Sequence, residues 1–264
     1  MTLTLGGGPL SSAPRGSLNF SLEDAPKHRL LFEDHPRRIR ALVDGHSILD
    51  STRGKLLHES NILPRYYLPL EDIDERYLEP SDHTTHCPFK GDAAYFDLAV
   101  GERRIENAVW HYAEPMEPAS WLRGYASVYT EAADLWLQED EPVLDGHLRD
   151  PYHRVDVLES SRQVEVTLGG ERIASSDRPK LLFETGLPPM VYLLRADVMP
   201  GVLEPSDATS TCPYKGHAHY WNVRAGGELA KDGAWGYEAP LPEALKVAGH
   251  LSFAGEGVEV TLDY

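Results

Sequence analysis

The chain contains two cysteines, and each lies in the same eight-residue phrase. Residues 84–91 read TTHCPFKG and residues 209–216 read TSTCPYKG. A cysteine becomes nucleophilic when its thiolate is favoured, and a lysine ammonium three positions later can lower the pKa of the thiol. A reaction would also need a group that moves protons. The candidate catalytic residues are Cys87, Lys90 and Asp82 in the first copy and Cys212, Lys215 and Asp207 in the second.

The same phrase also has a structural interpretation. Cysteine is among the residue types that are most often buried, and a proline followed by Lys-Gly is typical of a turn between strands. A catalytic cysteine would need a base, and we expect no histidine to be present in both copies of the repeat. We therefore favour cysteines that occupy structural turns and keep the catalytic interpretation as the alternative.

The phrase belongs to a long internal duplication, in which Cys212 lies 125 residues after Cys87. The offset holds without a gap from about residue 45 to residue 112 and pairs LEPSD at 78–82 with LEPSD at 203–207. A period of this length corresponds to a complete domain rather than to a solenoid repeat of about 20–50 residues. We expect a flexible N-terminal arm at 1–29, a first domain at 30–142, a linker at 143–150 and a second domain at 151–264.

Both copies show the sequence patterns of β-strands. Residues 38–44 (RIRALVD) and 163–169 (QVEVTLG) alternate between apolar and polar side chains, and the glycine that follows each is typical of a hairpin turn. Residues 93–100 and 218–225 alternate in the same way. These patterns predict a mainly β fold made of two tandem, homologous, small β-rich domains with few short helices.

Polar and aromatic residues at repeated positions could form a ligand pocket. Such pockets are mostly apolar and contain a few convergent polar groups. Aromatic residues on strands usually belong to the core, but some could line a pocket instead. The candidate ligand-binding residues are Arg53, Lys55, Glu59, Tyr95, Trp110 and Tyr112 in the first domain and Arg178, Lys180, Glu184, Tyr220, Trp235 and Tyr237 in the second.

Metal and nucleotide sites have less support in the sequence. A zinc site needs three or four nitrogen or sulfur ligands, and His83, His86 and Cys87 could supply them in the first copy alone. The second copy has Ala208 and Thr211 in place of the two histidines. Phosphate-binding loops of the GxxxxGKS or GxGxxG type do not occur in the sequence. We expect no metal site and no cofactor.

Composition excludes several classes of partner. The chain has 264 residues and a net charge of −17, a field that repels phosphate backbones. No apolar run approaches the roughly 20 residues of a membrane-spanning helix, and the N-terminus lacks the features of a secretory signal. We expect a cytoplasmic protein with free thiols and a small-molecule ligand, and neither nucleic acid nor a membrane as a partner. The sequence leaves the oligomeric state open.

The order of the motifs resembles one known family. Residues 67–73 (YLPLEDI), 78–82 (LEPSD), 85–95 (THCPFKGDAAY) and 110–112 (WHY) have counterparts at 192–198, 203–207, 210–220 and 235–237. Together they resemble domain-of-unknown-function family 427, in two tandem copies. The resemblance implies a compact fold similar to the β-tent or Mss4-like folds, whose members often hold structural zinc or a small ligand in an aromatic cage. This sequence lacks the paired CxxC motifs of the zinc-bearing members.

Two functional hypotheses of different classes follow. In the favoured hypothesis each domain binds an anionic or carbonyl-bearing metabolite in an aromatic pocket. In the alternative the chain is a cysteine-dependent enzyme that acts on a small metabolite through the TxxCPxKG motif. A third hypothesis is an interaction scaffold in which one domain has lost any activity. Whether the protein is an enzyme stays open at this point.

Overall fold

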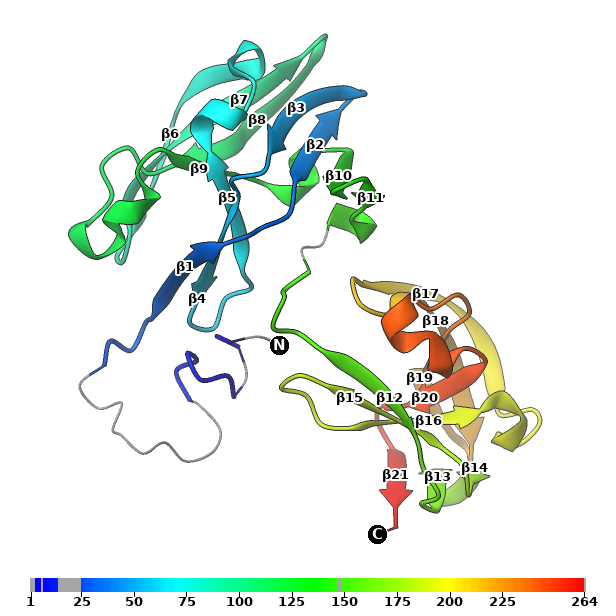
Figure 1. The fold of residues 1–264 in the computed structure, drawn as a ribbon. Helices are drawn as coiled ribbons and strands as arrows, with labels where there is room; N and C mark the ends of the chain where they lie inside the picture. Colours follow the sequence, from blue (N-terminus) through cyan, green and yellow to red (C-terminus); the bar gives the residue numbers. More distant parts are fainter. Residues whose placement is uncertain (1–2, 6, 14–24, 147–148, 264) are drawn as a thin grey trace. The chain divides into compact units, whose positions relative to one another are not determined.

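The computed structural model describes residues 3–5, 7–13, 25–146 and 149–263. The chain forms two compact units, Met1–Asp150 and Pro151–Tyr264 (Figure 1). Both units consist mainly of β-strands, which confirms the fold class predicted from the alternating sequence pattern. Among the described residues, every helical segment is a 3-10 helix of three or six residues.

The first unit contains a large and a small antiparallel sheet. The large sheet has the order β1-β4-β5-β9-β8-β7-β6, with β1 (Leu30–Asp34), β4 (Lys55–Glu59), β5 (Arg65–Pro69), β6 (Leu78–Cys87), β7 (Gly91–Val100), β8 (Arg103–His111) and β9 (Tyr125–Val128). The small sheet has the order β11-β10-β2-β3, with β2 (Ile39–Val43), β3 (His46–Ser51), β10 (Leu135–Gln138) and β11 (Glu141–Pro142). The 3-10 helices are η1 (Leu70–Asp72), η2 (Glu75–Tyr77), η3 (Glu117–Leu122), η4 (Thr130–Ala132) and η5 (Leu144–Gly146).

The second unit repeats this plan. Its large sheet has the order β12-β15-β16-β20-β19-β18-β17, with β12 (Val155–Glu159), β15 (Lys180–Glu184), β16 (Met190–Leu194), β17 (Leu203–Cys212), β18 (Gly216–Ala225), β19 (Glu228–Tyr237) and β20 (His250–Phe253). Its small sheet has the order β14-β13-β21, with β13 (Val164–Leu168), β14 (Glu171–Ser176) and β21 (Val258–Leu262). The 3-10 helices are η6 (Arg195–Asp197) and η7 (Pro242–Val247).

The opening hairpin of each unit forms as the sequence predicted. In the first unit β2 and β3 are joined by Asp44 and Gly45, whose φ angles are 48° and 76°. Two consecutive residues with positive φ are the signature of the type I′ turn, whose twist matches that of the flanking strands. Gly169 and Gly170, with φ of 58° and 76°, join β13 and β14 in the same way.

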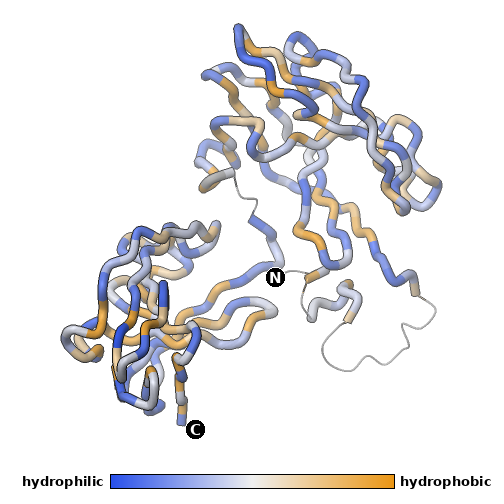
Figure 2. The backbone as a smooth tube through the Cα atoms, turned by 180° about the vertical axis from the view of Figure 1, so that it is seen from behind, coloured by the Kyte–Doolittle hydropathy of each residue, from blue (hydrophilic) through white to orange (hydrophobic). Residues whose placement is uncertain are grey.

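Each face of the large sheet carries a hydrophobic cluster. In the first unit Leu68 of β5 and Val109 of β8 belong to the cluster that includes the small sheet. Their neighbours Tyr67 and Trp110 belong to the other cluster, which includes Leu122 of η3. Successive residues of a strand point to opposite faces, so the sheet lies between two cores. Figure 2 shows hydrophobic segments within the strands of both units.

Some residues outside the expected first domain also contact the first unit. Val143, in the expected linker, belongs to its core. Thr4 and Ser11 are buried, and the backbone N–H of Asn61 donates to the carbonyl of Thr4 at 2.9 Å. Described residues near the N-terminus therefore lie against the loop that follows β4. Residues 1–2, 6 and 14–24 of the expected arm lie outside the described residues.

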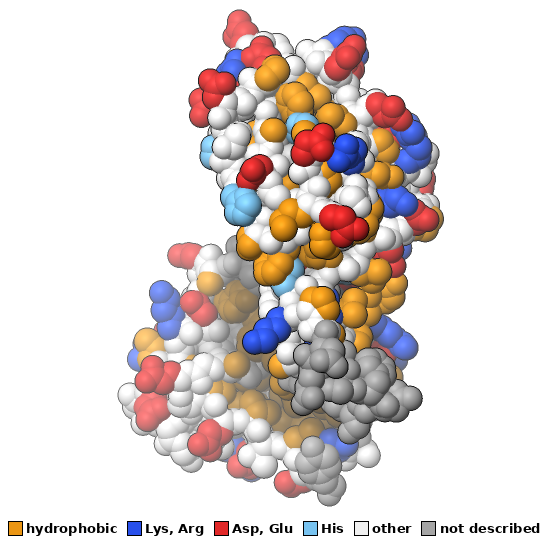
Figure 3. Space-filling view, turned by 90° about the vertical axis from the view of Figure 1, so that its left-hand side faces the viewer, with side chains coloured by type: hydrophobic (Ala, Val, Ile, Leu, Met, Phe, Trp, Pro, Cys, Tyr) orange, Lys and Arg blue, Asp and Glu red, His pale blue; other side chains and the backbone are white. Residues whose placement is uncertain are grey.

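The chain has an excess of acidic residues, and on the face that Figure 3 shows they do not gather in one patch. Figure 3 shows acidic and basic side chains interspersed over that face, as the net charge of −17 allows when 25 Lys and Arg accompany 42 Asp and Glu. In the described part of the chain no helix is long and apolar enough to cross a membrane.

Candidate functional site

The two cysteine motifs form turns at the same place in both units. The backbone N–H of Lys90 donates to the carbonyl of Cys87 at 3.3 Å, and that of Lys215 donates to the carbonyl of Cys212 at 3.2 Å. Proline at the second position presets the φ angle that such turns need. Each turn joins two ten-residue strands of its large sheet, β6 to β7 and β17 to β18. The motif therefore forms a turn between two strands in each unit. Both thiols are free and half-buried.

Each turn places its lysine in an ion pair that is buried in the first unit and largely buried in the second. The Nζ of Lys90 donates to the carboxylate of Glu59, at the end of β4 and 31 residues earlier in the chain. Glu59 is 5% exposed and Lys90 is 8% exposed. Lys215 donates in the same way to Glu184, at the end of β15. The structure thus joins two residues of the sequence prediction in each unit.

A histidine completes this group, and its presence in both units corrects the expectation that no histidine is shared. His28 Nε2 lies 3.2 Å from Glu59 Oε2, and His153 Nε2 lies 2.9 Å from Glu184 Oε1. His153 follows His28 by the same offset of 125 residues. Extending the offset upstream of residue 45 would have found the pair, because both histidines precede an arginine. We call the two groups the His–Glu–Lys clusters: His28, Glu59 and Lys90, and His153, Glu184 and Lys215.

The histidines also lie against the cysteine turns. The rings of His28 and Phe89 are stacked, with centroids 4.0 Å apart and an interplanar angle of 9°. The rings of His153 and Tyr214 are 4.1 Å apart. In each case the aromatic partner is the third residue of the CPxK turn. Each imidazole is therefore held between a turn residue and a buried carboxylate.

The electrostatics of the second cluster favour an ionised carboxylate. Burial acts to raise the pKa of Glu184, but hydrogen bonds from His153 and Lys215 outweigh burial and lower this pKa from 4.5 to about 2. The carboxylate is therefore charged at neutral pH. Burial also raises the pKa values of Tyr112 and Tyr237 far above the usual range, so both phenols keep their protons.

The predicted aromatic residues lie beside the clusters and largely in the core. Tyr95, Trp110 and Tyr112 are buried in the first unit. In the second unit Tyr237 is buried, whereas Tyr220 and Trp235 are half-buried. Lys90 Nζ lies 5.8 Å from the centroid of the Tyr112 ring, a distance at which a cation interacts with an aromatic face. This contact links the polar cluster to the aromatic core.

Hydrogen bonds fix several of these rings. Trp110 Nε1 donates to the Tyr67 hydroxyl at 3.1 Å, and the hydroxyls of Thr85 and Tyr95 lie 2.9 Å apart. The sequence analysis did not name Tyr67 as a site residue, although its match to Tyr192 is part of the repeat.

The predicted basic residues of β4 and the preceding turn lie elsewhere. Arg53 forms ion pairs with Glu71 at 2.7 Å and with Asp72. Lys55 pairs with Asp34, and Lys180 pairs with Glu159 in the second unit. In the described part of the chain no hydrogen bond or ion pair joins Arg53, Lys55, Arg178 or Lys180 to a His–Glu–Lys cluster.

The LEPSD motif belongs to an irregular part of the sheet. The register of β6 and β7 shifts between Ser81 and Thr84, and Ser81 Oγ donates to Asn107 Oδ1 at 2.5 Å. Asp82 is exposed at this bulge, and Asp207 is exposed at the equivalent bulge between β17 and β18. The motif therefore shapes the sheet, and no described hydrogen bond or ion pair places either aspartate next to its cysteine.

The histidines of the possible zinc site have other neighbours. His86 Nδ1 lies 2.6 Å from Asp92 Oδ1, and the ring of His83 lies 4.6 Å from that of Tyr95. Within the described ranges no group of three or more His, Cys, Asp or Glu side chains is placed to hold a metal ion.

Comparison with known proteins agrees with the internal repeat. No curated protein matches the chain. A family model described as "Domain of unknown function (DUF427)" matches residues 31–139 and again residues 156–264. The two matches cover more than half of the chain, fall one in each unit and confirm the resemblance seen in the motifs. The chain therefore belongs to the DUF427 family and carries two tandem copies of its domain.

Proposed function

We propose that each unit binds a small, neutral, carbonyl-bearing metabolite at its His–Glu–Lys cluster. The observation that carries the proposal is the Lys–Glu ion pair that both units keep, Lys90 with Glu59, which is buried, and Lys215 with Glu184, which is largely buried. A buried ion pair is weak evidence for stability, because desolvation can cost more than the charges gain from each other. The ion pair is present in both units, although neighbouring positions of the repeat differ. For example, Phe183 of the second unit stands where the first unit has His58. This favours a role in recognition.

The charges of the cluster select the ligand class. Glu59 already neutralises Lys90, so an anionic ligand would compete with a buried carboxylate for the same ammonium. A lysine ammonium has three hydrogen-bond donors, and the carboxylate does not use all of them. A neutral carbonyl oxygen can accept one of the remaining protons without adding charge to a buried site. The hydrocarbon part of such a ligand would contact the neighbouring aromatic residues.

The experiment is ligand-observed NMR with pairs of small probes that differ in charge. N-methylacetamide and γ-butyrolactone are compared with acetate and butyrate. The test variant combines Lys90→Met and Lys215→Met, and the control combines Lys55→Met and Lys180→Met, whose lysines pair with exposed carboxylates. We expect saturable binding of the neutral probes to the wild type and the control, and its loss in the test variant.

Two results would overturn the proposal. One is tighter binding of the carboxylates than of the neutral probes. The other is unchanged binding in the test variant, provided that thermal unfolding shows both variants to be folded.

A cysteine-dependent reaction at the same cluster is the second candidate. The observation that favours it is the histidine beside each cysteine turn, since His28 stacks on the residue two positions after Cys87. In this reaction the imidazole takes the thiol proton and the sulfur attacks the carbonyl carbon. A C–S bond forms, the carbonyl π electrons move to oxygen, and the Lys90 ammonium stabilises the negative charge. It ranks second because no hydrogen bond in the described residues joins either thiol to its histidine.

Alkylation rates separate the two candidates. Iodoacetamide labelling of Cys87 and Cys212 at pH 7 is measured for each cysteine by peptide mass spectrometry. A nucleophilic cysteine is labelled in the folded protein, and the combined variant His28→Gln and His153→Gln slows its labelling. Equal rates in the wild type and this variant, or protection of both thiols until denaturation, would exclude the catalytic candidate and leave binding alone.

A further inference from the structure

The small sheet ends differently in the two units. In the first unit β11 pairs with β10 and forms the outer edge of the order β11-β10-β2-β3. In the second unit β21 takes the position of β10, next to β13, and the order β14-β13-β21 ends there. The other outer strands are edges in both units: β1 and β12, β3 and β14, β6 and β17. Among the described residues, β21 is therefore the edge that one unit covers and the other leaves open.

The backbone of Val260 faces this open edge. The N–H of Asp263 donates to the carbonyl of Gln163, so the backbone groups of Asp263 face β13. These groups alternate between the two sides of a strand, and those of Val260 therefore face outward. Strand register aligns Val260 with Trp136 of the first unit, whose carbonyl accepts the N–H of Val143 at 2.8 Å. The outward N–H and C=O of Val260 are thus placed to pair with a further strand.

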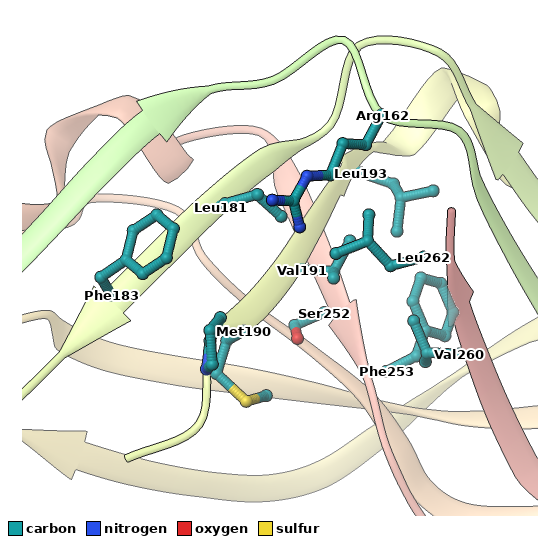
Figure 4. Close-up of a pocket in the computed structure, with 11 residues that line it drawn as sticks. Arg162, Leu181, Phe183, Met190, Val191, Leu193, Ser252, Phe253, Val260 and Leu262 are labelled. Carbon is teal, nitrogen blue, oxygen red and sulfur yellow. The ribbon is translucent and has the colours of Figure 1, made fainter. Parts of the chain in front are cut away.

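Apolar side chains lie exposed beside the open edge. Val260 is 39% exposed, whereas Trp136 is 5% exposed and belongs to the same core cluster as Val143. Val260 and Leu262 also line a pocket of about 290 Å³ between β21 and the strands β15, β16 and β20 (Figure 4). Phe183, another lining residue, is 39% exposed. The apolar surface at the edge of β21 therefore continues into a hollow of the second unit.

The sequence of β21 suits strand pairing. Proline, lysine and bulges are features that commonly protect the edge of a sheet. The strand reads VEVTL, contains neither proline nor lysine, and pairs with β13 without a shift of register. By contrast, the edge strand β17 contains Pro205 and an irregular register. The edge of β21 is therefore open to a further strand, whereas that of β17 is protected.

We propose that β21 pairs antiparallel with β21 of a second copy of the chain. A twofold axis at Val260 places the two Val260 residues opposite each other, and each N–H donates to the other carbonyl. Each Glu259 then faces Thr261 of the other copy. Each Val258 faces Leu262 in the same way.

Charge favours a second copy as the partner. In this register no two like charges within β21 face each other, and opposed like charges would destabilise the pairing. The contact closes after two copies, because each chain carries one β21. A pair of short strands is a small interface, so we expect a weak dimer that exchanges with the monomer. The dimer is independent of the function proposed for the His–Glu–Lys clusters.

The experiment is sedimentation equilibrium of the full chain over a series of concentrations. We expect a reversible equilibrium between monomer and dimer in the wild type. Val260→Pro removes the outward N–H, which the pairing with β13 does not use, and should weaken the dimer about tenfold or more. Hydrogen exchange of β13 checks that the small sheet of this variant stays paired.

Charge changes at Thr261 test the register. Thr261→Lys places a lysine opposite Glu259 of the other copy and should tighten the dimer about fivefold, and Thr261→Glu should weaken it by about the same factor. Thr209→Lys and Thr209→Glu are the controls, because they change the net charge equally at an exposed position of β17. In about 0.15 M salt, which screens distant charges, the controls should leave the dissociation constant unchanged.

Three results would overturn the proposal. The first is a chain that stays monomeric through the whole series, including one whose own residues protect β21 from hydrogen exchange. The second is a dimer that the folded Val260→Pro variant leaves intact. The third is a dissociation constant that responds to changes at Thr261 in the same way as to changes at Thr209. If Val260→Pro opens the small sheet, the comparison of Thr261 with Thr209 decides alone.

Discussion

Lys90 and Glu59 form an ion pair with both side chains almost fully buried, although 31 residues separate them in the sequence. Lys215 and Glu184 form the same pair in the second unit. By contrast, the nearby pair of Lys55 and Asp34 has an exposed carboxylate. The two kinds of pair in one unit therefore provide a matched comparison.

Breaking the buried pair should destabilise the first unit strongly. Lys90→Met leaves the Glu59 carboxylate buried without its lysine, and we expect a loss of about 3–5 kcal/mol. Combining Lys90→Met with Glu59→Leu removes both charges and should cost less than either change alone. The free energy of unfolding is measured from denaturant-dependent hydrogen exchange of β4 and β7 peptides. Lys55→Met is the control, with an expected loss below about 1 kcal/mol. Strictly additive effects would contradict the prediction.

The stability of the second unit should fall in acid because of Glu184. Its pKa is about 2 in the folded protein instead of 4.5. The unfolded state therefore binds more protons between these values, and stability falls as the pH drops from about 5 to about 2. The full effect is about 3 kcal/mol. Glu184→Gln should have lower stability at neutral pH and a flatter pH dependence in this window, measured by hydrogen exchange of β15. If stability depends on pH in the same way in the wild type and in Glu184→Gln, the prediction is wrong.

The Tyr67 hydroxyl should stabilise the first unit through Trp110. Tyr67→Phe removes the acceptor of the Trp110 Nε1–H hydrogen bond and leaves a buried donor unsatisfied. We expect a loss of about 1–2 kcal/mol in the free energy of unfolding. Tyr77→Phe is the control, because the Tyr77 hydroxyl is 3.5 Å from His46 in an exposed contact. A change below about 0.5 kcal/mol at both tyrosines would show that Trp110 finds another partner.

Local sequence pattern predicted much of the fold. Alternation at residues 38–44, with the turn residues Asp44 and Gly45, was enough for the first hairpin, because strand period and turn type are local properties. The order of the large sheet could not be read in the same way. Pairing of β1 with β4, and placement of β9 between β5 and β8, depend on contacts between distant segments.

The site could be predicted only in part. Comparison of the two copies of the repeat selected Glu59 and Lys90, but it selected Arg53 and Lys55 as well. Only the fold decides which of these basic side chains is buried. Asp82 shows a second limit of prediction from sequence. It lies at a bulge, which changes the direction of the side chains, and the alternating pattern of a strand does not reveal a bulge.

His28 and His153 were missed for a different reason. Both precede an edge strand whose apolar residues differ between the units, LLFED in β1 and VDVLE in β12. Because many apolar residues can fill such a strand, the repeat is weak there and the shared histidine is easily overlooked.

These histidines should set the acid stability of the clusters. The hydrogen bond from His153 is the largest influence that lowers the pKa of Glu184. His153→Leu removes it, so the pKa of Glu184 should rise toward 4.5 and acid should open β15 at a higher pH. Hydrogen exchange of β15 against pH measures the midpoint. Lys180→Met changes a lysine of the same strand whose partner is exposed, and it should leave the midpoint in place. If His153→Leu also leaves it in place, Lys215 alone holds the carboxylate in its charged form.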